Sequence, residues 1–170
     1  MILENLPIFL HRASNNGGFS GIKLIFSKAN QYIPITCTDE ITITYISGGV
    51  KKTDTYSGLS ITLVSIPCDA NTQVVITGAV EEIDLSMQAY LISAKIKNTA
   101  LQALDCSNCP ALAEIKYAAG NEDVSTAIAQ AITDATADNG TVYTDSAAAY
   151  YSTIATAATT KGWTIEQIAA

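Results

Sequence analysis

Two cysteines, Cys106 and Cys109, have the spacing with the clearest chemical potential in this sequence. The C-x-x-C pattern is typical of dithiol redox couples and of one half of a zinc site. A redox pair normally begins a helix, whereas Pro110 follows here, and a zinc site needs two further ligands. We therefore favour the interpretation that Cys106 points into the core and Cys109 packs in the adjacent turn. No cofactor and no metal are expected.

A short acidic run, Glu81, Glu82 and Asp84, would suit a cation site or an acid–base pair. Because side chains alternate along a strand, Glu82 and Asp84 share one face and Ile83 takes the other. The simpler interpretation is therefore a solvated outer face. His11 is the only imidazole, so a Ser-His-Asp or two-histidine centre would have to be built around it. No nucleophile is paired with a base, and we predict that the protein is not an enzyme.

Composition and charge limit the classes of partner. The chain is 48% hydrophobic and 15% charged, which predicts a packed, β-rich protein whose surface needs neighbours. With 9 Lys+Arg against 16 Asp+Glu and no basic stripe in the sequence, a nucleic-acid partner is not expected. Glu4 and Pro7 interrupt the apolar start and no long apolar window follows, so neither a signal peptide nor a membrane partner is expected.

The elements that position these residues follow from a repeat in residues 79–121. The pattern apolar-x-x-apolar-x-apolar occurs four times, at steps of 11, 10 and 11 residues. A helix would repeat at about 3.6 residues, so these steps predict short strands stacked by a coiling chain with a true period of 21. That period aligns Ile83 with Leu104 and Ala94 with Ile115. The inward side chains are predicted to stack as a structural ladder. Its members are Leu85, Ile96, Leu104, Cys106, Ile115 and Tyr117 from the repeat, and Trp163 from the segment that follows.

Residues 1–78 are predicted to form a β-rich, sandwich-like docking domain. Turn-forming Gly, Asn and Pro separate its apolar or alternating segments. We predict strands at 7–11, 21–26, 31–37, 40–46, 59–66 and 73–77, and a polar connection at 47–58. Pro34 cannot donate a ladder hydrogen bond, which favours an edge or a bend for 31–37.

Residues 122–170 are predicted to be an α/β cap on the short solenoid of 79–121. One helix follows Asp123 and is ended at Asn139 and Gly140 by left-handed backbone. A second helix runs from an N-cap at 145–146 to Gly162, and a strand follows each helix. The whole chain is thus predicted to be α+β and mostly β.

The repeats carry a resemblance to a known family. Ala100-Leu-Gln-Ala-Leu-Asp-Cys-Ser-Asn resembles the 21-residue leucine-rich repeats of bacterial surface proteins. The tail Asp138-Asn-Gly-Thr-Val, with Lys161-Gly-Trp-Thr-Ile, resembles a closing module of repeat-bearing bacterial and bacteriophage structural proteins.

This resemblance implies a non-enzymatic virion structural protein of a tailed bacteriophage: a capsid decoration, head-fibre or tail component made in the host cytoplasm. Its partners would be other virion structural proteins, in a homo-oligomer or multi-copy assembly. The repeats would then form a rigid spacer, with specificity in the strands before it. The alternatives are a bacterial leucine-rich-repeat module that binds a protein or glycan at a cell surface, and a redox enzyme built on Cys106 and Cys109.

Overall fold

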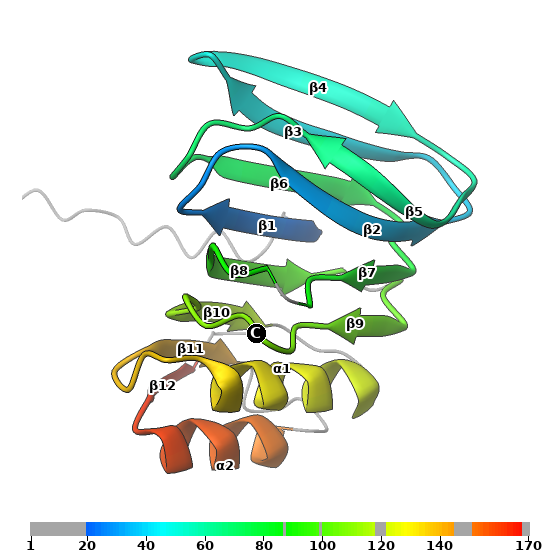
Figure 1. The fold of residues 1–170 in the computed structure, drawn as a ribbon. Coiled ribbons are helices and arrows are strands. Elements are labelled where there is room, and N and C mark those ends of the chain that lie inside the picture. The colour runs from blue at the N-terminus through cyan, green and yellow to red at the C-terminus, as the bar shows by residue number, and fades with distance from the viewer. Residues whose placement is uncertain (1–19, 87, 99, 118–121, 145–150, 168–170) are drawn as a thin grey trace, which may run out of the picture.

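A computed structural model describes residues 20–86, 88–98, 100–117, 122–144 and 151–167. The fold is α+β and mostly β, as the sequence predicts. Two sheets face each other across one core, and two helices lie beyond the end of the smaller sheet (Figure 1).

The larger sheet has eight strands. Along the sheet they are β12 (Thr164–Gln167), β11 (Thr141–Thr144), β10 (Glu114–Tyr117), β8 (Leu91–Lys97), β1 (Gly21–Phe26), β6 (Gln73–Gly78), β3 (Ile41–Ser47) and β4 (Val50–Tyr56). Strands β8, β10, β11 and β12 are mutually parallel, and the other pairings are antiparallel. Because β1 pairs with both β6 and β8, this sheet runs across the predicted boundary at residue 78.

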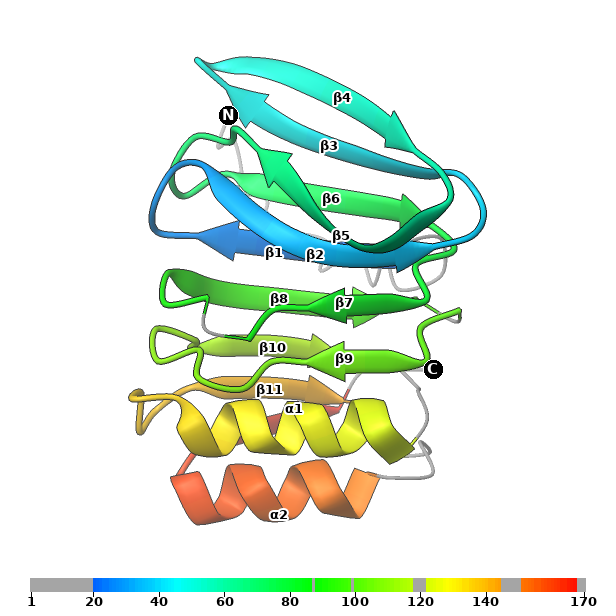
Figure 2. The ribbon, with the colours of Figure 1, turned by 45° about the vertical axis from the view of Figure 1, so that its right-hand side comes forward.

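The smaller sheet has four strands. In order they are β5 (Leu59–Ile66), β2 (Gln31–Cys37), β7 (Glu82–Asp84) and β9 (Ala103–Asp105). Beyond β9, helices α1 (Glu122–Asp134) and α2 (Tyr151–Lys161) continue this wall while β11 and β12 extend the opposite one (Figure 2). The face of α1 that packs inward is apolar and fully buried, and it includes Val124, Ile128, Ala131 and Ile132.

The parallel pairs follow the 21-residue period. Ala94 lies opposite Ile115 and Ile96 opposite Tyr117, while Ile83 lies opposite Leu104 on the other wall. Every residue of the predicted ladder is buried: Leu85, Ile96, Leu104, Cys106, Ile115, Tyr117 and Trp163. They belong to one continuous core that also includes residues of strands β1, β2, β3, β5 and β6.

One prediction about the first strands is wrong, and one alternative of another is excluded. Residues 47–58 are not a simple connection, since they contain β4, which forms a hairpin with β3. The turn is Gly48-Gly49, with φ of 59° and 74°, the positive values that a two-residue hairpin turn requires. Strand β2 is not at an edge, which excludes the first of the two alternatives for 31–37, but its pairing with β5 is irregular between Ile35 and Cys37. Its ladder to β7 covers only Ile35 and Thr36. Pro34 therefore lies just outside that ladder.

Gly140 has a different role from the predicted one. Helix α1 ends at Asp134, and Gly140 does not have a positive φ. A Cβ at this position would lie 2.3 Å from Cε2 of Trp163, so the glycine is needed because the indole packs directly on its backbone. Gly162, with φ of 79°, does follow the end of α2. The predicted strand at 7–11 and the N-cap at 145–146 lie outside the described residues.

Candidate functional site

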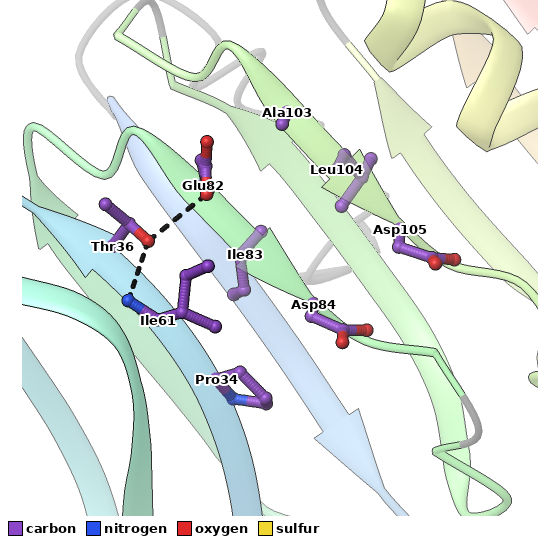
Figure 3. Close-up of a pocket in the computed structure, with 9 residues that line it drawn as sticks. All are labelled: Pro34, Thr36, Ile61, Glu82, Ile83, Asp84, Ala103, Leu104 and Asp105. Carbon is purple, nitrogen blue, oxygen red and sulfur yellow. Dashed lines mark hydrogen bonds between the residues drawn. The ribbon is translucent and has the colours of Figure 1, made fainter.

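The outward face of the four-stranded sheet carries a groove of about 240 Å³ (Figure 3). Strands β2, β7 and β9 form its floor, and Ile61 of β5 stands at one side. Its outward side chains divide into an apolar and an acidic half. They are Pro34, Thr36 and Ile61 on one side, and Glu82, Asp84 and Asp105 on the other.

Ile61 is held at the groove by a chain of two hydrogen bonds. Its backbone N–H donates to Thr36 Oγ1 at 3.0 Å, and the Thr36 hydroxyl donates to Glu82 Oε2 at 3.2 Å (Figure 3). Ile61 has φ of 42°, in the left-handed region that a β-branched side chain disfavours. The bend at this residue shifts the register of β5 against β2 and turns the Ile61 side chain to solvent, where it is 71% exposed.

The apolar half of the groove continues onto the edge of the sheet. Leu63 is 62% exposed and Tyr32 56% exposed, and Leu63 lies directly opposite Pro34. Among the described strands, β5 pairs only with β2, so none of them covers the backbone groups on its other side. Large apolar side chains along an open edge strand are a liability unless a partner covers them.

The acidic half repeats along the sheet. Asp84 and Asp105 are neighbours across β7 and β9, 21 residues apart. Each accepts a hydrogen bond from the backbone N–H two residues later, Ser86 at 2.7 Å and Ser107 at 2.9 Å. These turn contacts fix both carboxylates on the outer face, beside the exposed Glu82. Strands β2, β5, β7 and β9 contain no lysine or arginine, so the carboxylates give this face a negative potential.

The groove has the chemistry of a binding surface. Its carboxylates stand beside threonine and apolar side chains, and no thiol or imidazole lines it. Within the described part of the chain, no group of three or more His, Cys, Asp or Glu residues is placed to hold a metal ion. Glu81, the third member of the acidic run, accepts a hydrogen bond from the Thr38 N–H at 3.1 Å. His11 lies outside the described residues.

The C-x-x-C cysteines lie in the core, away from this face. Both are buried free thiols. Burial raises the pKa of Cys106 well above its ordinary value and raises that of Cys109 to about 11. The Cys109 thiol donates to the Leu85 carbonyl at 3.1 Å. A reactive cysteine has a lowered pKa and an accessible sulfur, and these two have the opposite properties.

The outward face of the larger sheet carries a row of lysines that sequence reasoning missed. Lys23 lies opposite Lys95, and Lys95 lies opposite Lys116, on three adjacent strands. Lys97 points to the same side two residues along β8. The sequence itself has no basic stripe, and only the sheet register brings these distant lysines together. The one signal in the sequence was the shared 21-residue spacing of Lys95 and Lys116.

One lysine of this row already has partners on its own face. Glu114 and Lys116 form an ion pair at 3.7 Å on one strand, and Lys116 Nζ lies 4.8 Å from the centre of the Tyr143 ring.

Comparison with known protein families, curated proteins and solved structures finds no match to this chain. Among the described helices, none is long and apolar enough to cross a bilayer.

Proposed function

We propose that this chain is a non-enzymatic structural protein that assembles in many copies, as a capsid decoration, head-fibre or tail component of a tailed bacteriophage. The observation that carries the proposal is the outward face of the four-stranded sheet. It exposes Tyr32, Ile61 and Leu63 beside a row of carboxylates, and among the described strands it ends at the edge strand β5. Such a surface has the composition of an assembly interface.

The resemblance of residues 100–117 and 138–165 to repeats and closing modules of bacterial and phage structural proteins supports the virion assignment. We infer that strands β7 to β10 form a short leucine-rich-repeat-like solenoid. The two helices and β11 and β12 would be its cap, and strands β1 to β6 a sandwich-like docking part. Buried thiols with raised pKa values favour this function over a redox enzyme.

The proposal is tested by deleting the gene and then adding the purified chain back to the particles that form without it. Particles made without the gene are mixed with purified chain, pelleted and probed for bound protein. We expect saturable binding that is lost in Leu63→Glu, which places a charge in the apolar half of the groove. The matched control is Val50→Glu, at an exposed apolar position of β4 on the other sheet, which should bind normally. Particles that bind no chain, or bind Leu63→Glu equally well, would contradict the proposal.

A further inference from the structure

Strand β5 forms an edge of the smaller sheet without the features that normally protect an edge. Natural edge strands carry charged residues, above all lysine, or proline, which discourage another strand from pairing with them. Strand β4, at an edge of the larger sheet, has Lys51, Lys52 and Asp54. Strand β5 reads Leu-Ser-Ile-Thr-Leu-Val-Ser-Ile and contains neither a charge nor a proline. Its composition is that of a strand with a neighbour on each side.

Both faces of β5 are open near its start. Residues 60–63 are all exposed, whereas only alternate side chains face solvent in a strand that covers a core. Thr62 lies opposite Ile35 of β2, so their side chains point to the same side of the sheet. Ile35 is fully buried, yet Thr62 is exposed. The described residues therefore leave β5 uncovered along its side as well as on its outward face.

Residues 7–11, which lie outside the described residues, have the composition that this side of β5 requires. Their sequence, Pro-Ile-Phe-Leu-His, predicts a strand. Such a strand would carry Ile8 and Leu10 on one face and Phe9 on the other. Pro7 cannot donate a ladder hydrogen bond, which suits a strand that is itself an edge. This segment would therefore close the sheet with an edge that has the protection β5 lacks.

The start of β1 and the start of β5 lie at the same end of the molecule (Figures 1 and 2). Strand β1 begins beside the end of β6, with which it is antiparallel. The chain leaves β6 at Gly78, and Glu81 then donates its N–H to the Thr36 carbonyl at 3.0 Å. The Glu81 carboxylate accepts from the Thr38 N–H at 3.1 Å. The Gly58 N–H donates to the Thr38 carbonyl at 3.2 Å, and β5 begins at the next residue.

The linker between the segment and β1 is long enough to reach β5. It consists of residues 12–20, and an extended chain spans about 3.3 Å per residue, so it reaches about 30 Å. A crossing between facing sheets takes about 10 Å, and three strand spacings add about 14 Å. The shortest route brings residue 11 to the end where β5 starts. The segment would then run antiparallel to β5.

The charges of the segment favour the same direction. Its last residue, His11, is followed by Arg12, the only arginine of the sequence. Asp39 and Glu40 are exposed in the connection that follows β2, and Glu81 lies in the adjoining turn. An antiparallel segment brings its cationic end to these carboxylates, where unlike charges attract.

We propose that residues 7–11 add to the open side of β5, within the same molecule, as an antiparallel strand of the smaller sheet. The backbone groups on that side of β5 then gain hydrogen-bond partners, and its apolar side chains gain neighbours. This inference goes beyond the proposed function, which uses the outward face of the sheet rather than its edge. A closed edge would leave that face as the surface for other proteins, without uncontrolled strand pairing.

Photo-crosslinking in the full chain tests this placement. The photoreactive residue p-benzoylphenylalanine replaces Leu63, which is exposed on β5, and in a control chain it replaces Val50, which is exposed on β4. After irradiation, trypsin releases the start of the chain as a peptide ending at Arg12, and mass spectrometry identifies what is joined to it. We expect the probe on β5 to join this peptide within one chain, and the probe on β4 not to join it.

Variants of the segment provide matched controls. Ile8→Asp with Leu10→Asp places charges in an apolar contact, so we expect the crosslink yield to fall by about 10-fold or more. Ser14→Asp with Asn16→Asp makes the same net charge change in the linker and should leave the yield unchanged. Thermal melting of each variant shows whether the rest of the chain remains folded.

Hydrogen exchange reads the same contact without a probe. In the variant Ile8→Asp with Leu10→Asp, amides of residues 59–66 should exchange about 10-fold or more faster than in the wild type, because they lose hydrogen-bond partners. Exchange in β4, the edge strand of the other sheet, should not change.

Other outcomes would overturn the inference. They are a probe on β5 that joins only other peptides or none, a crosslink that forms only between two chains, and amide exchange in residues 59–66 that is the same in the variant and the wild type. The proposed function is judged separately by add-back to particles, so either result can fail while the other holds.

Discussion

Ile61 combines an unusual backbone conformation with an unusual exposure. A β-branched residue in the left-handed region costs of the order of 1–3 kcal/mol, and here the side chain gains little burial in return. Its N–H is held by Thr36, which also holds Glu82, so the strained residue and the acidic half of the groove are fixed together. Strain at an exposed position is expected where the side chain is needed for contact.

Replacing Ile61 with asparagine should therefore stabilise the isolated chain. Asparagine tolerates the left-handed region, so we expect Ile61→Asn to raise the free energy of unfolding by about 1 kcal/mol in urea titrations. The same change should weaken add-back to particles. Leu63→Asn, on the same strand with ordinary φ, serves as the control and should not increase stability. A decrease in stability for Ile61→Asn would show that the conformation is not strained.

The thiols of Cys106 and Cys109 should be inert in the folded protein. Burial raises the pKa of both, so the thiolate that reacts with disulfide reagents is scarce at pH 8. We expect labelling with a chromogenic disulfide to follow global unfolding and to become fast in denaturant. Fast labelling of either cysteine in the native protein would instead support the redox interpretation.

Tyr45 should make stability depend on alkaline pH. Its hydroxyl donates to Asp54 Oδ2 at 2.7 Å, and this bond, with burial, raises the pKa of Tyr45 to about 12. The folded state then holds a proton that the unfolded state releases near pH 10. The stabilisation is complete below pH 10 and is lost as pH rises through 12.

Comparison with Tyr45→Phe separates the pH dependence of stability that comes from Tyr45 from any that comes from the cysteines. Melting temperatures of both proteins are measured at intervals from pH 8 to 12. We expect the wild type to be the more stable protein below pH 10 and the difference to shrink above it. A difference that stays constant with pH would exclude the Tyr45–Asp54 bond as its source.

At the scale of elements, strands and their register could be predicted from the sequence where the local hydrophobic pattern matches the pairing within the sheets. The 21-residue period gave the parallel register because each strand of the repeat pairs with its own copy one turn later, as Ala94 does with Ile115. Strand β4 was missed because it pairs on one side only and its residues are mostly exposed, so no apolar alternation is required. The lysine row was missed because Lys23 meets Lys95 only through an antiparallel pairing that spacing does not encode.

The contact between Gly140 and Trp163 joins the last strands to the rest of the C-terminal segment. The Trp163 indole N–H donates to the Ala137 carbonyl at 2.6 Å, and its ring lies against Gly140. Gly140→Ala should lower the free energy of unfolding by about 1–3 kcal/mol, because the added methyl group overlaps the indole. In a Trp163→Phe background the same change should cost less. Equal costs in the two backgrounds would place the strain elsewhere.

At the scale of the whole molecule, the net charge of −7 is unevenly distributed between the two sheets. The strands of the smaller sheet contain only acidic charges, whereas β1, β8 and β10 carry Lys23, Lys95, Lys97 and Lys116 together with Glu114, which pairs with Lys116. One continuous core joins the two sheets. A single core beneath an exposed apolar and acidic face suits a component that is added repeatedly to an assembly.

The proposal that matters most is that the chain is a multi-copy structural component of a virion. If a phage encodes the chain, quantitative mass spectrometry of its purified particles tests this most directly, with the major capsid protein as the internal standard. We expect a fixed stoichiometry of many copies per particle, retained after high-salt washing and density-gradient purification. A chain that is expressed in the infected cell but absent from purified particles would contradict it.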